Sequence, residues 1–275
     1  MHEALLAAVV FLLLLLSAAA GMFVKAGLSE RHQSRETLEL VSLAITMLVT
    51  FAALVISLLI YSVKSSFDQA NTDMAALAAQ IVQTDQCLRN YGPETTDTRA
   101  LLRDYIAEVI ASTWPFEPRP PGMGHLVALR PISPGAMESV ALGDVINEIG
   151  LGIRHLAPVD AYHRGIADSC LTDYHNLVQA RWTVNEEARS TISQPFFVVM
   201  IFWLMVIFIC FGLNAPRTTF VFMTIALCAL SIASAVFVML DMDTPFSGVI
   251  QVSSQPMRDA YSDITRPYVV PDTPR

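Results

Sequence analysis

Charged residues are scarce in this chain. Only 15% of its 275 residues are Asp, Glu, Lys or Arg, whereas about a quarter is usual in a soluble domain. The mean hydropathy is correspondingly high, at +0.49. The shortage is concentrated in four runs that contain no charge at all: residues 4–24, 40–63, 190–216 and 218–240.

Each charge-free run is long enough to cross a bilayer, which takes roughly 20 apolar residues in a helix. We therefore predict an all-α integral membrane protein with four transmembrane helices in two hairpins, and a helical extramembrane domain between spans 2 and 3. The expected parts are hairpin 1 (1–63), the helical domain (64–194), hairpin 2 (195–240), and an interfacial motif with a disordered tail (241–275).

The first run could instead be a cleaved signal peptide, because Ser17 to Ala20 resembles a small-residue cleavage region. A signal peptide has a positively charged residue before its apolar core, however, and no Lys or Arg precedes this one. We therefore expect a retained helix.

Sequence motifs of catalytic and metal-binding sites are also missing. We find no nucleophile elbow, no phosphate-binding glycine loop and no H-E-x-x-H motif. His163 and His175 are twelve residues apart and out of helical phase, so a metal site is not expected. The net charge of −8 argues against nucleic acid as a partner. We expect neither an enzyme nor a cofactor, and we expect membrane lipid as a partner.

Cysteines are few, and two of the four lie inside the apolar runs. Cys87 and Cys170 lie in the polar middle segment and could form one disulfide if that segment faces an oxidising compartment. The sequence leaves their state open.

Sidedness depends on the basic residues near the spans. Lys25, Arg31 and Arg35 follow the first span, and the positive-inside rule then places the large segment outside the cytoplasm. Basic residues also flank the spans on the opposite side: Lys64, Arg181, Arg189 and Arg258. The rule therefore favours an extracytoplasmic position for the large segment but does not decide the sidedness.

The polar segment has the apolar period of helices. The second spanning helix should continue well beyond Lys64, until Asn90-Tyr91-Gly92-Pro93 breaks it. Further helices are expected over 95–112, 137–149 and 159–187.

Two stretches of sequence resemble a known family when taken together. One runs from Leu240 to Gly248 (LDMDTPFSG) and continues through Val252-Ser253 and Pro256-Met257-Arg258. The other opens with Asp68-x-Ala70 and includes Tyr105 and Trp114-Pro115. They resemble the bacterial bestrophin-like domain family, whose function is unknown and which is distantly similar to bestrophin anion channels. The resemblance covers nearly the whole chain.

The resemblance implies a homo-oligomeric ion channel, because bestrophins are pentamers whose second transmembrane helix lines the pore. Bestrophins keep their middle domain in the cytoplasm, in contrast to the charge pattern of this chain. The acidic clusters of the bestrophin calcium clasp have no recognisable counterpart here, so calcium control is not implied.

Two candidate sites follow. A stripe of small and hydroxyl-bearing side chains runs along one side of the second span, at Ser42, Thr46, Thr50, Ala53 and Ser57. It could line a pore, or it could be a tight helix–helix interface. The second site is an interfacial motif at the end of the fourth span, at Asp241, Asp243, Pro245, Phe246 and Gly248. It could form a charged mouth, or simply end a helix.

The expected function is a multi-pass channel or pore-like assembly in the cell membrane, by analogy the bacterial inner membrane. The alternative is a membrane-anchored interaction or sensor module without conductance, whose helical domain (64–194) binds a partner.

Overall fold

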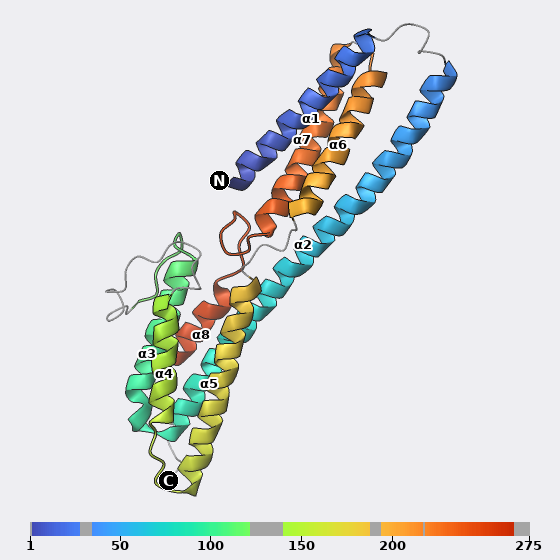
Figure 1. Ribbon diagram of the computed structural model, residues 1–275. Helices are drawn as coiled ribbons and strands as arrows, with labels where there is room; N and C mark the ends of the chain where they lie inside the picture. The colour runs from blue at the N-terminus through green and yellow to red at the C-terminus, as the bar shows by residue number, and fades with distance from the viewer. Residues whose placement is uncertain (1, 28–34, 122–139, 188–193, 217, 267–275) are drawn as a thin grey trace, which may run out of the picture. The chain divides into compact units, whose positions relative to one another are not determined.

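The structure is a computed structural model, and it describes residues 2–27, 35–121, 140–187, 194–216 and 218–266. All regular elements in these ranges are helices (Figure 1). They are α1 (His2–Gly27), α2 (Arg35–Tyr91), η2 (Pro93–Thr95), α3 (Thr96–Thr113), α4 (Val140–Arg154), α5 (Ala161–Glu187), α6 (Gln194–Asn214), α7 (Thr219–Met242) and α8 (Gln255–Thr265).

Four of these helices are long and apolar enough to cross a membrane: α1, α2, α6 and α7. This confirms the predicted fold class. The chain divides into two compact units, a membrane unit (Met1–Phe67 and Ser190–Thr244) and a helical unit (Asp68–Arg189 and Pro245–Arg275). Helix α2 belongs to both.

In the membrane unit, α1 packs against α6 and α7. The core of this packing consists of buried aliphatic and aromatic side chains, among them Val10, Leu14, Leu204, Phe208 and Ala229. The helices α1 and α6 approach closely because a glycine on each helix lies against the backbone of the other helix. A methyl group on Gly212 would lie 2.0 Å from the carbonyl oxygen of Ala18, and one on Gly21 would lie 2.1 Å from that of Ile209. Small residues permit such close contact between helices in lipid.

Lys25, at the end of α1, donates a hydrogen bond of 3.0 Å from Nζ to the carbonyl oxygen of Ala215. Ala215 directly follows α6. The C-terminal ends of α1 and α6 therefore lie at the same end of the membrane unit.

The helical unit contains the second half of α2 and α3, α4, α5 and α8. Helix α2 ends at Tyr91, and Gly92 has a φ of 136° that favours glycine. Thr95 then donates from Oγ1 to the carbonyl oxygens of Leu88 (2.7 Å) and Gly92 (2.8 Å). These bonds cap the end of α2 and start the reversal into α3.

The predicted helices of the polar segment are present with small shifts at their ends. Helix α3 covers 96–113 where 95–112 was expected, and α5 covers 161–187 where 159–187 was expected. The helix expected over 137–149 extends to Arg154, and its first three residues lie outside the described ones. So does the expected disordered tail beyond Arg266.

Helix α8 was not predicted. It buries Met257, Ala260 and Ile264, and it belongs to the helical unit with the rest of the chain after Pro245. The sequence did contain a signal, because Pro256 occupies the first turn of an apolar pattern with helical spacing.

Candidate functional site

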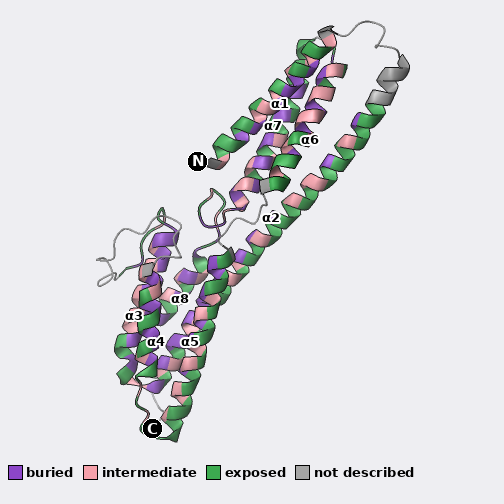
Figure 2. Ribbon diagram, viewed as in Figure 1, coloured by how far each residue is buried: buried purple, intermediate pink, exposed green. Residues whose placement is uncertain are grey.

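The small-residue stripe of α2 is exposed along its whole length. Ser42, Thr46, Thr50, Ala53 and Ser57 are all uncovered by the rest of the chain. Figure 2 shows how little of α2 is buried in its membrane half. In the most apolar part of α2 only 11% of residues are buried, against 33% in α1. The stripe therefore does not pack against the other helices that the structure describes.

Three of the four hydroxyl groups of the stripe bond to their own helix. Thr46 donates to the carbonyl oxygen of Ser42 (2.9 Å), Thr50 to that of Thr46 (2.8 Å), and Ser57 to that of Ala53 (2.8 Å). Each donor is thus satisfied four residues back, while the hydroxyl oxygen keeps acceptor capacity. Such a face can lie against protein or water without an unpaired donor.

The membrane half of α2 has three distinct sides. One side is buried, at Ile45, Ala52 and Val63, and Val63 belongs to the core of the membrane unit. Phe51 lies on another side, beside Leu58, and forms a tilted ring pair with Trp203 of α6, with ring centroids 5.0 Å apart. The stripe lies about 100° around the helix from Ile45, Ala52 and Val63, at 100° per residue. The third side carries large exposed apolar residues: Leu43, Met47, Leu54 and Leu58. Only the third side has the composition of a lipid-facing surface.

Helix α7 has a comparable set of small residues. Thr224, Cys228 and Ser231 are exposed, and Ala235 is half-buried. The two hydroxyls again bond back to their own helix, to Phe220 and Leu227, each at 3.0 Å. Among the residues that the structure describes, none covers Thr224, Cys228 or Ser231.

The interfacial motif is largely buried. Asp241 is 1% exposed and Asp243 is 7% exposed, and Pro245 and Phe246 are buried too, while Gly248 is half-buried. The N–H of Asp243 bonds to the carbonyl oxygen of Met239, so the aspartates end α7. Buried carboxylates require compensating partners. The stretch is therefore more than a solvent-exposed helix end.

The two stretches that carry the family resemblance meet in the helical unit. Trp114 donates from Nε1 to the carbonyl oxygen of Val252 (2.9 Å). Glu117 accepts from Arg258 at 2.8 Å and from the hydroxyl of Ser254. The N–H of Val252 bonds to the carbonyl oxygen of Pro245 (2.9 Å), which closes a loop around Phe246. These contacts attach the chain after α7 to the end of α3, which sequence reasoning did not foresee.

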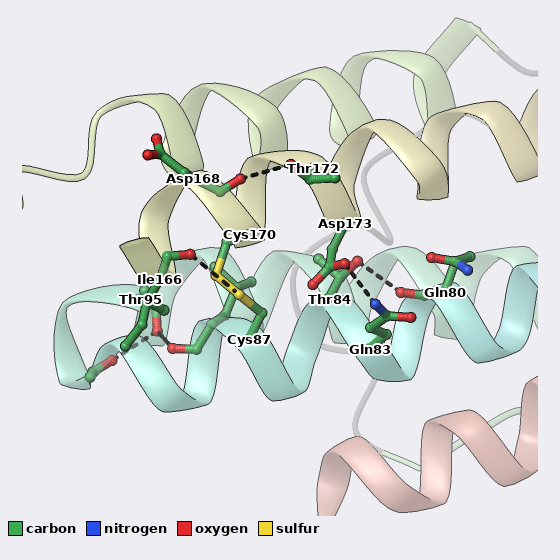
Figure 3. Close-up of a disulfide and its surroundings, with 12 residues drawn as sticks. Gln80, Gln83, Thr84, Cys87, Thr95, Ile166, Asp168, Cys170, Thr172 and Asp173 are labelled. Atoms are coloured by element: carbon green, nitrogen blue, oxygen red, sulfur yellow. Dashed lines mark hydrogen bonds between the residues drawn. A yellow bond between two sulfur atoms is a disulfide. The ribbon is translucent and has the colours of Figure 1, made fainter. Parts of the chain in front are cut away.

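A disulfide joins α2 to α5 (Figure 3). Cys87 and Cys170 are bonded, with Cα atoms 5.4 Å apart and a separation of 83 positions in the sequence. One helical turn before Cys87, Gln83 donates from Nε2 to Asp173 Oδ1 (2.7 Å). Burial raises the pKa of Asp173, and the bond from Gln83 opposes that shift. The pair that the sequence left open is therefore formed in the structure.

A buried tyrosine marks the core of the helical unit. Tyr105, on α3, is fully buried. Burial raises its pKa to about 12, against a smaller opposing effect of the Arg181 guanidinium. Within the described part of the chain, no three His, Cys, Asp or Glu side chains gather in a way that could hold a metal ion.

Comparison with known proteins identifies the family of this chain. No curated protein and no solved structure matches this chain. The family model described as "Bestrophin-like domain" does match, over residues 12–257. That range includes the second half of the first span, the other three spans, the disulfide and the interfacial motif, and the chain therefore belongs to the bestrophin-like domain family.

Proposed function

We propose that this protein is the subunit of a homo-oligomeric ion channel or pore-like assembly in the cell membrane. The observation that carries the proposal is the exposed small-residue stripe of α2, from Ser42 to Ser57. The hydroxyls of Thr46, Thr50 and Ser57 are satisfied within the helix. The stripe has smaller side chains than the lipid-facing side, and no other segment that the structure describes covers it. Copies arranged around an axis would place this stripe on the pore or between neighbours.

Reconstitution in liposomes tests the conductance. Wild-type protein should release a halide or potassium gradient, and Thr50→Leu should lower the rate severalfold because it adds bulk to the stripe. Leu54→Met, on the lipid-like side, is the matched control and should leave the rate unchanged. Absence of flux across a range of pH, together with a monomer in detergent, would contradict the proposal.

We also propose that the helical unit lies outside the cytoplasm. The Cys87–Cys170 disulfide favours this side, because disulfides persist in oxidising compartments and are rare in the cytosol. The charge pattern after the first span favours the same side. This arrangement would be opposite to that of bestrophins.

Thiol labelling tests the sidedness. With Cys210 and Cys228 replaced by Ser, a maleimide of high mass should label the denatured protein only after reduction, and then at two positions. Two labels without reductant, in protein trapped with acid directly from cells, would indicate free thiols and a reducing compartment.

One observation favours the alternative function of an interaction or sensor module. A groove of about 580 Å³ runs along α2 and α5 beside the disulfide, and its lining includes Gln83, Asn90, Tyr162 and Ser169. A partner that binds there would co-purify with the wild-type chain, and liposomes would show no conductance.

A further inference from the structure

A pocket in the helical unit gathers four of the chain's 17 basic residues. It has a volume of about 450 Å³ and is lined by Arg89, Asn90, Arg99, Arg103, Ile264, Thr265 and Arg266. These residues come from the end of α2, the first half of α3 and the end of α8. We propose that this pocket binds a small oxyanion with at least two negative charges, such as phosphate or a phosphate monoester.

A buried carboxylate organises two of the four guanidinium groups. Asp85, whose side chain is 1% exposed, accepts from Arg89 Nη2 at 2.8 Å. It also accepts from Arg99, from Nε at 2.8 Å and from Nη2 at 3.3 Å. Such a two-point bond holds a guanidinium in a defined plane. Arg89 and Arg99 are therefore oriented before any ligand arrives, which lowers the entropic cost of binding.

The pocket keeps an excess of positive charge. Arg103 follows Arg99 by one turn of α3 and makes no ion pair with any residue that the structure describes. Arg266 pairs with Asp263 at 3.4 Å, but both side chains are more than half exposed, so the pair is weak. Two carboxylates thus face four guanidiniums. The whole chain has a net charge of −8, so the pocket is positively charged in a protein that is negatively charged overall.

Donors also remain unused. The Nε atom of Arg89 is buried without a hydrogen-bond partner among the described residues. A buried donor without an acceptor costs free energy. An oxyanion can supply several acceptors at once, which a chloride ion cannot do with the same geometry.

The shape and chemistry of the lining define the ligand class. Guanidinium groups match the oxygen pairs of phosphates and carboxylates, and Asn90 and Thr265 add polar groups at the rim. Ile264 is the one aliphatic residue in the lining. A small polar anion suits this pocket better than an apolar ligand.

Calorimetric titration of the full-length protein in neutral detergent tests the proposal. Inorganic phosphate is added at constant ionic strength, with chloride as the balancing anion. Wild-type protein should bind one phosphate per chain with saturation. Arg103→Gln should weaken binding about tenfold, because one charge-assisted bond is lost, and Arg103→Lys should have an intermediate effect.

Arg164→Gln is the matched control. Arg164 is exposed on α5 and does not line the pocket, yet its replacement removes the same charge. It should change affinity less than twofold, and thermal unfolding without phosphate should show that the Arg103 variants are folded. Binding without saturation, or an equal loss in Arg164→Gln and Arg103→Gln, would overturn the proposal.

A second titration distinguishes the source of the phosphate group. If short-chain phosphatidic acid binds more than about tenfold tighter than phosphate and Arg103→Gln weakens both, the pocket holds a lipid headgroup. If the two bind equally, the ligand is a free ion. Either result supports an oxyanion site. If Arg103→Gln binds both phosphate and phosphatidic acid as tightly as the wild-type protein does, the proposal is contradicted.

Discussion

At the scale of single residues, two glycines decide how the membrane unit packs. Gly21 on α1 and Gly212 on α6 each face a carbonyl oxygen of the other helix at a distance that excludes a side chain. The backbones can touch there only because neither residue has a Cβ atom. Apolar burial alone would not distinguish this pair of helices from any other in lipid.

Gly212→Ala should therefore destabilise the membrane unit. The added methyl would meet backbone, which has little freedom to move, and overpacking of this kind costs about 1–3 kcal/mol. Thermal unfolding in detergent, followed through Trp203 on α6, should show a midpoint lower by several degrees.

Gly165→Ala is the control for this change. Gly165 lies on exposed α5 with no atom within 4 Å of an added Cβ. Its replacement should be neutral or stabilise by up to about 1 kcal/mol, as Ala is the better helix former. An equal fall in both variants, or no fall in Gly212→Ala, would contradict the close-packing account.

At the scale of elements, the sequence predicted helices well where apolar periodicity was long. The continuation of α2 beyond the membrane, its end at Tyr91 and the apolar face of α3 all follow from spacing and from Gly92-Pro93. Helix α8 escaped prediction because an 11-residue helix is marginal alone and depends on what it packs against.

The candidate sites were predictable only in part, for a related reason. Spacing placed Ser42, Thr46, Thr50, Ala53 and Ser57 on one side of a helix, but no local pattern reveals which side meets the chain's own bundle. The arginine pocket combines residues more than 160 positions apart, so only the tertiary fold assembles it.

At the scale of the whole molecule, the number of spans was predictable from length and hydropathy. Which spans pack against one another was not predictable in this way. Helix α1 packs on α6 and α7, and the membrane half of α2 is left with two uncovered sides. One of these is composed like a lipid-facing surface. The other is the small-residue stripe, which the proposed assembly would place against further copies of the chain or on the pore.

Chemical cross-linking at the stripe tests this central claim most directly. In protein with Cys210 and Cys228 replaced by Ser, Thr50→Cys has one free thiol per chain, and treatment with a short bismaleimide in membranes should give a covalent dimer. Leu58→Cys lies two turns further, about 80° around the helix on the lipid-facing side, and should remain largely a monomer. A Thr50→Cys protein that stays monomeric, or that cross-links no more than Leu58→Cys, would contradict an assembly built around α2.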